Sequence, residues 1–203
     1  MLLIVLAAAA WGGWPRRADL RAFEPAEMAR LETAMWRDYY EKRYPALFYH
    51  LTTLSRTQFG FSPLDGVRIA LSAARAAKAF QPTRSRAAAA AAMPELIVYY
   101  ELLRPAAPNA FDVDAAARLE LDWWQARREA VAPRDYGLTI ARVAALTYGR
   151  AADDSGIRQF GIARAEAMAF RDARGEAITD ADWMRIENQL GEAYRTLKAS
   201  IGR

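Results

Sequence analysis

The stretch VDAAARLELDWWQARRE, residues 113–129, decides the fold. Either Asp112 or Asp114 starts the helix, since the carboxylate of each suits an N-cap, and the helix stops before Pro133, which a helix interior does not tolerate. Three alanines lie in its first turns, and alanine is the strongest helix former. Glu120 shares one helical face with the two adjacent tryptophans that follow it. The stretch therefore predicts a helix with an aromatic and charged face.

The residues before this stretch predict more helices, separated by proline and glycine. A first helix opens at Pro25 and is interrupted at Pro45, since proline removes an amide donor and disfavours helix at Tyr44. Its apolar stripe has helical spacing and consists of Met28, Leu31, Met35, Tyr39, Leu47, Leu51 and Leu54. A second helix runs from Pro63 to Phe80, and we expect its inward face to hold Leu64, Val67, Leu71 and Ala74.

An alanine-rich segment comes next, and the same helical pattern continues to the end of the chain. Thr83 or Ser85 caps this segment, and Pro94 restarts a helix after it. The six consecutive alanines at 87–92 predict a face along which two helices approach closely, because a flexible linker would be rich in glycine and serine. Further helices are expected at 133–148, from Asp153 or Asp154 to 174, and at 179–201.

The composition favours an all-α fold with a thin core. Hydrophobic residues make up 53% of the chain, but 45 of them are alanines, which bury little area each. The expected connections are short, and short connections favour antiparallel neighbours. We therefore predict an antiparallel bundle of about seven helices, preceded by an apolar N-terminal segment. The helical domain covers residues 22–203, with a division into subdomains 22–104 and 112–203 as the alternative.

The N-terminal segment MLLIVLAAAAWGGW, residues 1–14, carries no charged side chain. As a helix with about 1.5 Å rise per residue it reaches about 21 Å, less than the roughly 30 Å of hydrocarbon in a bilayer. Residues typical of a membrane interface follow in order: Trp11, Trp14, Arg16, Arg17 and Arg21. We expect residues 1–21 to form a membrane anchor and a basic connector. A signal peptide and a buried core helix are the alternatives.

The arginines behind the apolar run also predict the side of the membrane. Positive charges tend to stay on the cytoplasmic side, which places the helical body in the cytoplasm. Processing of the segment as a signal would reverse this orientation and give an exported or periplasmic protein. The chain has no cysteine, which is compatible with either compartment.

The charged residues do not predict a nucleic-acid partner. The net charge is +4, but its basic residues are dispersed among 24 acids, and no stripe of one sign appears. A surface that follows a phosphate backbone needs several cations on one face with few acids between them. We therefore expect no nucleic acid among the partners.

The lack of cysteine and the single histidine, His50, exclude most familiar metal sites. A dimetal carboxylate site needs Glu and His three residues apart, and Leu47 stands where the glutamate would be. We expect His50 to form a hydrogen bond at the edge of a cluster of Tyr44, Phe48 and Tyr49. The sequence contains no nucleophile elbow and no phosphate-binding glycine loop. No cofactor and no metal are predicted, and an enzymatic role is less favoured than a binding role.

Charged and aromatic residues gather in two of the expected helices, and they form our candidate site. The helix around 113–129 holds Glu120, Asp122, Trp123, Trp124 and Arg127, and the helix that ends near 174 holds Arg164 and Glu166. Apolar neighbours on the same faces predict that some of these charges are buried, and a buried charge needs a partner. We expect a structural network of Glu and Arg between helices. The alternative is a pocket lined by carboxylates.

Four short motifs combine aromatic and charged residues on helix faces: MWRDYY (35–40), LELDWW (119–124), RAEAM (164–168) followed by RD (171–172), and DWMRI (182–186). In this combination, residues 25–203 resemble a group of bacterial all-helical proteins with apolar N-termini. The resemblance implies an all-helical fold, but it brings no activity and no catalytic residue with it.

Two classes of function agree with these features. The first is a membrane-anchored helical interaction protein, an accessory subunit or scaffold of a bacterial membrane-associated complex, with the membrane and another protein as partners. The second is an enzyme or carrier whose pocket lies among aromatic and acidic side chains, since helix bundles hold apolar ligands between their helices. Exposed aromatic residues favour the first class, and a hollow core favours the second.

Overall fold

A computed structural model describes residues 18–202, and this part of the chain is helical with no strand. The predicted all-α class is therefore confirmed. The four-residue helix α5 (Arg86–Ala89) accompanies eight longer ones, where about seven were expected. These are α2 (Pro25–Tyr40), α3 (Tyr44–Phe59), α4 (Pro63–Phe80), α6 (Met93–Leu103), α7 (Val113–Arg128), α8 (Pro133–Tyr148), α9 (Ser155–Arg174) and α10 (Asp180–Ile201).

Proline, glycine and capping side chains set the helix boundaries. Helices α2, α3, α4, α6 and α8 each carry a proline in their first turn, where no amide partner is lost. The interruption near Pro45 is confirmed, because three residues separate α2 from α3. Helices α3 and α8 end at Gly60 and Gly149, whose φ angles of 73° and 61° are left-handed. Five helices begin at capping side chains: Ser62, Ser85, Asp112, Asp154 and Thr179.

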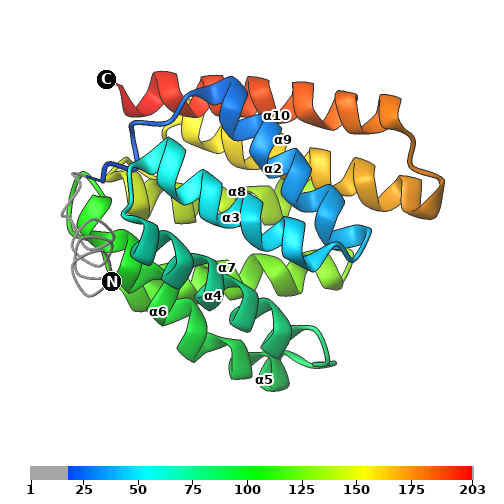
Figure 1. Ribbon diagram of the computed structural model, residues 1–203, viewed down its shortest axis with the longest axis horizontal. Coiled ribbons are helices and arrows are strands. Elements are labelled where there is room, and N and C mark those ends of the chain that lie inside the picture. Colours follow the sequence, from blue (N-terminus) through cyan, green and yellow to red (C-terminus); the bar gives the residue numbers. More distant parts are fainter. Residues whose placement is uncertain (1–17, 203) are drawn as a thin grey trace, which may run out of the picture.

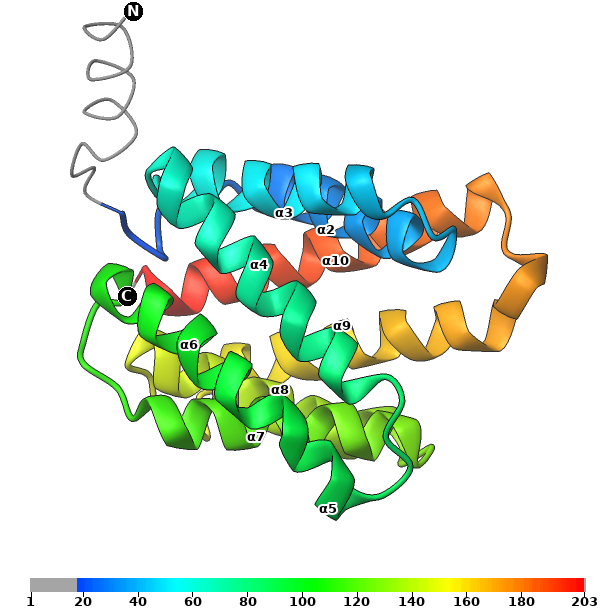
Figure 2. The same ribbon diagram turned by 60° about the horizontal axis from the view of Figure 1, so that its bottom comes forward.

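The eight long helices form a closed ring. From α2 to α10 each long helix packs against the next long helix in the chain, and α10 packs back against α2 (Figures 1 and 2). The N-terminal and C-terminal helices of the described chain therefore lie side by side, although more than a hundred residues separate them. Closure of the ring defines an interior that side chains from many helices face.

Buried apolar side chains fill this interior in two clusters. One cluster joins α2, α8, α9 and α10 and includes Trp123 of α7. The other joins α4, α6 and α7 and includes Leu20 and Phe61 from the connecting segments. Each cluster contains residues from both sides of the loop at 104–112. The division into two subdomains there remains a hypothesis that these contacts do not support.

Helices α8 and α9 cross at two glycines. A Cβ atom on Gly161 would lie 2.3 Å from the carbonyl oxygen of Gly137, and one on Gly137 would lie 2.7 Å from Cα of Ile162. Both distances are shorter than van der Waals contact, so only hydrogen in place of a side chain allows the two backbones to approach this closely. The crossing brings α9, with its Arg164, firmly against α8.

The predicted inward face of α4 is wrong. Leu64 and Leu71 are 48% and 39% exposed, and Ala74 is exposed as well. The buried face instead consists of Gly66, Ile69, Ala70, Ser72 and Ala76. Helix α4 packs against α3 on one side and α6 on the other, and small residues allow this double contact. The apolar residues of α4 repeat with helical spacing on two faces, so the spacing did not identify the buried one.

The six alanines at 87–92 are not one helix face. They are split between α5 and a turn of 3-10 helix at Ala90–Ala92, and only Ala89 and Ala92 are buried. Both are fully buried beside α4 and α7, so a close approach exists at these two positions only. Ser85 is the capping residue of this segment, as one of the two alternatives predicted.

The connector that precedes α2 packs onto the helical body from residue 19 onward. The amide of Asp19 donates to the carbonyl of Phe59 at 3.0 Å, and the amide of Leu20 donates to that of Ala106 at 2.9 Å. Leu20 is 4% exposed. The exposed side chain of Arg21 pairs with Asp19 at 3.1 Å.

The expected anchor falls mostly on residues that the structure does not describe. Trp11, Trp14, Arg16 and Arg17 lie outside the described residues, so the predicted membrane interface is not tested by them. Within residues 18–202, none of the helices combines the length and the apolar character that a bilayer crossing requires.

Candidate functional site in the interior of the helix ring

Three adjoining pockets lie between the helices of the ring, each partly open to solvent, and we call them together the cavity. The tryptophan pocket, about 240 Å³, lies between α2, α4, α7 and α9. The α3 pocket, about 480 Å³, lies under α3 and is also lined by α6. The tyrosine pocket, about 230 Å³, reaches toward α8 and α10. Arg164 lines all three pockets, and Tyr99 and Glu120 line both the α3 pocket and the tyrosine pocket.

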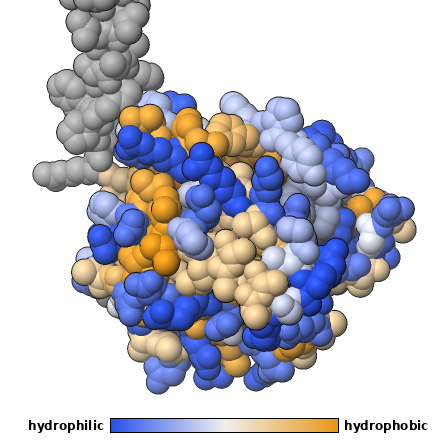
Figure 3. Space-filling view, turned by 90° about the horizontal axis from the view of Figure 1, so that it is seen from below, coloured by the Kyte–Doolittle hydropathy of each residue, from blue (hydrophilic) through white to orange (hydrophobic). Residues whose placement is uncertain are grey.

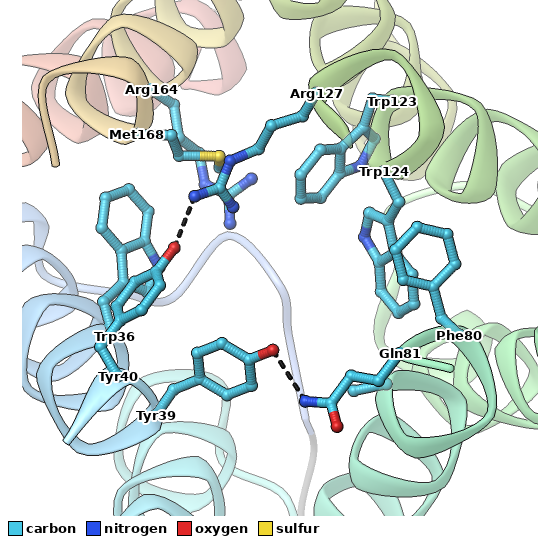
Figure 4. A pocket seen from close by; sticks show the side chains of 11 residues that line it. Trp36, Tyr39, Tyr40, Phe80, Gln81, Trp123, Trp124, Arg127, Arg164 and Met168 are labelled. Atoms are coloured by element: carbon cyan, nitrogen blue, oxygen red, sulfur yellow. Dashed lines mark hydrogen bonds between the residues drawn. The ribbon is translucent and has the colours of Figure 1, made fainter. Parts of the chain in front are cut away.

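Aromatic side chains form most of the wall of the tryptophan pocket. Trp36, Tyr39 and Tyr40 of α2 face the indoles of α7 across the open space (Figure 4). The rings of Trp123 and Trp124 meet edge to face with centroids 6.1 Å apart. The ring of Phe80, at the end of α4, lies 5.2 Å from that of Trp124 and completes this side (Figure 4). The wall therefore presents large π faces that favour an apolar or cationic occupant.

One buried ion pair crosses the cavity wall and joins three helices. Nε of Arg164 in α9 donates to Oε1 of Glu32 in α2 at 2.9 Å, and Nη2 donates to the same oxygen. The hydroxyl of Tyr194 in α10 donates to the second oxygen of Glu32. The Glu32 side chain is 4% exposed and that of Arg164 is 20% exposed. Because Arg164 lines all three pockets, its remaining surface faces the cavity.

The surroundings of this pair keep Arg164 and Tyr194 in their protonated forms. Burial is the largest single influence on the pKa of Arg164 and would lower it, but the charge and hydrogen bond of Glu32 together with Tyr194 and Glu120 raise that pKa. Burial, followed by the charge of Glu32, raises the pKa of Tyr194 well above its ordinary value. Tyr194 therefore stays protonated and serves as a hydrogen-bond donor.

A second carboxylate, that of Glu120 in α7, faces the cavity without an ion pair. The hydroxyl of Tyr100 donates to Oε2 at 2.9 Å, and Nε1 of Trp124 donates to Oε1 at 3.0 Å. Among the described residues, no Lys, Arg or His nitrogen lies within 4.0 Å of this carboxylate. Burial raises the pKa of Tyr100, and the charge of Glu120 raises it further, so the phenol remains a donor.

The indole of Trp123 adds a donor without an acceptor. Its Nε1 is buried and has no hydrogen-bond partner among residues 18–202. The residue is 7% exposed and lines the tryptophan pocket and the α3 pocket. A buried donor that lacks a partner costs free energy, so a polar atom of a ligand is a favourable neighbour for it.

Cations lie at the edge of the tryptophan pocket. Nε and Nη2 of Arg127 donate to the two oxygens of Asp172 at 2.9 and 2.8 Å, and Nη2 also donates to the hydroxyl of Tyr40. The guanidinium of Arg171 lies 3.0 Å from the centre of the Tyr40 ring. Burial would lower the pKa of Arg127, but the bond to Asp172 and the other partners raise it. This group ties α2, α7 and α9 together beside the pocket.

Five of the seven candidate residues from the sequence lie at the cavity: Glu120, Trp123, Trp124, Arg127 and Arg164. Asp122 and Glu166 are exposed on the outer surface, so the expected network does not include them. The partner of Arg164 is Glu32, which sequence reasoning missed. Glu32 lies beside Leu31 and Met35 on the apolar stripe of α2, and this interruption of the stripe was the signal that could have found it.

His50 forms the expected hydrogen bond, but its partner was not foreseen. Its Nδ1 lies 2.7 Å from Oδ2 of Asp38, and its ring contacts that of Tyr49 with centroids 5.5 Å apart. Asp38 is 3% exposed and also accepts from Nε of Arg43 at 2.9 Å. These bonds join the end of α2 to the start and middle of α3, so His50 holds the helix pair that covers the α3 pocket.

Residues 18–202 contain no group of three or more His, Cys, Asp and Glu side chains arranged to hold a metal ion. Comparison with known proteins adds no functional assignment: no protein family, no curated protein and no solved structure matches this chain at a significant level.

Proposed function

We propose that the protein binds an apolar small molecule in the cavity, as a carrier or as a binding protein. The observation that carries this proposal is the α3 pocket, about 480 Å³, with adjoining pockets that share its walls. Protein interiors are normally packed as densely as organic crystals, and ligand pockets commonly measure about 300 to 1,000 Å³. The cavity has the size and the predominantly apolar lining of such a pocket.

The polar groups of the cavity also support a ligand site. They are few, they lie in an aromatic wall, and they include the carboxylate of Glu120, which has no ion pair, and the unpaired donor of Trp123. Ligand sites typically combine an apolar wall with a small number of such groups, which orient the bound molecule. The proposal concerns binding, and it assigns no catalytic residue.

Binding is tested with N-phenyl-1-naphthylamine, a neutral apolar dye that fluoresces in apolar surroundings and accepts energy from excited tryptophan. We expect saturable fluorescence when tryptophan is excited, because Trp123 and Trp124 line the cavity. The variant Ala77→Phe places a ring into the tryptophan pocket and the α3 pocket, which Ala77 lines, and we expect it to weaken binding at least tenfold.

The matched control is Ala173→Phe, which adds the same ring at an exposed position of α9. It should bind the dye like the wild type. Thermal unfolding followed by circular dichroism verifies that both variants are folded. Equal binding by the two variants, or no saturable binding by the wild type, would contradict the proposal.

We also propose, from the sequence, that the chain is a membrane-anchored interaction protein whose body lies on the cytoplasmic side. The observation in its favour is the apolar surface of α4 and α6, where Leu64, Leu71 and Val98 are 48%, 39% and 43% exposed. Figure 3 shows apolar patches among hydrophilic residues on the face that these helices form. A surface of this kind suits a protein partner or a lipid surface. The two proposals are compatible, since an anchored protein can also carry a ligand.

A further inference from the structure

We infer that the cavity selects ligands that carry a positive charge beside their apolar part, and that Glu120 is the group that recognises this charge. The inference rests on the proposed binding of an apolar molecule in the same cavity, and it names the chemical class of that molecule: an apolar organic cation such as an alkylammonium.

One carboxylate among the charged side chains that line the cavity has no ion-pair partner. Glu32 and Arg164 neutralise each other through two hydrogen bonds. Arg127, at the tryptophan pocket, is neutralised by Asp172. Glu120 is the remaining charged group that lines these pockets, and within residues 18–202 no cation pairs with it. Glu120 is partly buried, and a carboxylate that is partly removed from water attracts a cation more strongly than one in bulk water.

The neighbours of Glu120 hold its carboxylate in place. Both of its oxygens accept hydrogen bonds, one from Tyr100 at 2.9 Å and one from Trp124 at 3.0 Å. Because both donors are neutral, they orient the carboxylate without forming an ion pair with it, and a cationic ligand could form one.

The aromatic wall beside Glu120 suits the same ligand. Trp36, Trp123 and Trp124 line the α3 pocket together with Glu120. Cations already occupy faces of such rings in this molecule: the guanidinium of Arg164 lies 5.5 Å from the Trp123 ring, and that of Arg128 lies 3.5 Å from the Phe80 ring. Indole rings bind ammonium groups through their negative faces. An anionic ligand would meet the unpaired carboxylate of Glu120, while Arg164 is already paired with Glu32.

Three probes of the same length separate charge from apolar character: octyltrimethylammonium, 1-octanol and octanoate, each used to displace N-phenyl-1-naphthylamine at pH 7.5 and low ionic strength. We expect the cation to displace the dye at a concentration at least tenfold below that of octanol. Octanoate should be the weakest of the three.

The variant Glu120→Gln removes the charge and keeps the shape and an acceptor oxygen for Tyr100 or Trp124. It should lose at least tenfold in affinity for the cation and change by less than twofold for octanol. The control Asp122→Asn makes the same change of charge two residues away, at an exposed position of α7. It should leave all three affinities unchanged.

The outcomes distinguish this inference from the proposed function. If octanol binds and the cation binds no better, the inference is wrong while the cavity remains a ligand site. If none of the probes displaces the dye and the dye itself does not saturate, the proposed function is wrong. The comparison of the three probes on the wild type decides the matter even if Glu120→Gln does not fold.

Discussion

Glu32 joins three helices through one side chain. Its carboxylate accepts from Arg164 of α9 and Tyr194 of α10 while the residue itself belongs to α2, and it is 3% exposed. A buried charge that loses its partner retains the full penalty of its removal from water. The stability of the ring where α2 meets α9 and α10 therefore depends on this residue.

The variant Glu32→Gln should lower the free energy of unfolding by about 3 to 5 kcal/mol, because it leaves the guanidinium of Arg164 buried without a counter-charge. Urea unfolding followed by circular dichroism measures the change. Glu166→Gln is the control: Glu166 is exposed, and we expect a change within about 0.5 kcal/mol. Similar losses in both variants would mean that the buried pair is not the stabilising contact.

The sequence predicted that Arg164 would be buried and paired, but it did not predict the partner. The burial of Arg164 could be predicted because apolar residues stand on both sides of it at helical spacing, and such spacing can be read from the local sequence. The partner lies 132 residues away in the chain, and a contact at that distance depends on how the helices pack. The same locality explains why Glu166 was expected to be buried: its neighbours are apolar, but its side of α9 faces outward.

Helix α10 begins at a capping box that also binds the preceding helix. The side chain of Thr179 accepts from the amide of Asp182, and the carboxylate of Asp182 accepts from the amide of Thr179 at 2.9 Å. Arg174, in the last turn of α9, lies 2.8 Å from the same carboxylate. These hydrogen bonds, first that of Arg174, lower the pKa of Asp182 from 3.8 to about 2.

This shift predicts how stability depends on pH. A carboxyl group with a lowered pKa in the folded state stabilises the fold above its unfolded pKa, and the contribution disappears as the pH falls through the folded pKa. The variant Asp182→Asn should therefore melt below the wild type at pH 7, and the difference should shrink between about pH 4 and about pH 2. Calorimetry across this range measures it. Asp153→Asn, at an exposed position, should show no such dependence.

Two glycines, one at the crossing of α8 and α9 and one in α10, should respond differently to substitution by alanine. Gly161→Ala should destabilise the fold by about 1 to 3 kcal/mol or more, because the new Cβ would meet backbone atoms 2.3 and 2.6 Å away. In contrast, the atom nearest to a Cβ on Gly191 of α10 is 3.6 Å away and belongs to a flexible arginine. Gly191→Ala should stabilise the protein by up to about 1 kcal/mol through helix propensity. Chemical denaturation measures the free energy of unfolding of both variants. Equal effects of the two substitutions on this free energy would contradict the prediction.

At the scale of helices, the sequence predicted boundaries better than faces. Prolines, glycines and capping residues act within one turn, so they marked the ends of α3, α4 and α8 well. The buried face of α4 could not be found in the same way. Alanine and glycine contribute little to a hydrophobic pattern, yet Gly66, Ala70 and Ala76 form the face that packs closely.

The cavity belongs to the whole molecule and could be predicted only in part. Aromatic and charged residues on α7 indicated a polar site in an apolar setting. In the structure these residues form the cavity wall beside Glu120. The space itself depends on the closure of the ring by α2 and α10. No local sequence pattern encodes the packing of two helices that lie so far apart in the chain. A hollow core was one of two alternatives, and the sequence favoured the other.

Removal of N-terminal residues tests the anchor and the domain boundary together. A chain that begins at residue 18 retains Leu20, and we expect it to unfold at the same temperature as the full chain. A chain that begins at residue 22 loses Leu20 with the backbone bonds of residues 19 and 20, which should cost about 2 to 5 kcal/mol.

Sedimentation with lipid vesicles, performed on the same three chains, measures membrane association. We expect the full chain to sediment with the vesicles and both shortened chains to remain in solution, because residues 1–14 carry no charge. Equal sedimentation of the full chain and the chain that begins at residue 18 would contradict an N-terminal anchor and would assign membrane contact to the helical body.

The contact between α2 and α10 also has a consequence for the order of events during synthesis. Residues 25–40 leave the ribosome early, but the helix against which they pack consists of residues 180–201. At about 5 to 20 residues per second, the two helices are made roughly 7 to 30 s apart. The hairpin of α8 and α9 is joined by a short loop and forms quickly. The ring, in contrast, cannot close before α10 has been synthesised. The cavity thus forms only after α10 has been made, so a nascent chain that lacks α10 would expose the apolar side of α2 to chaperones.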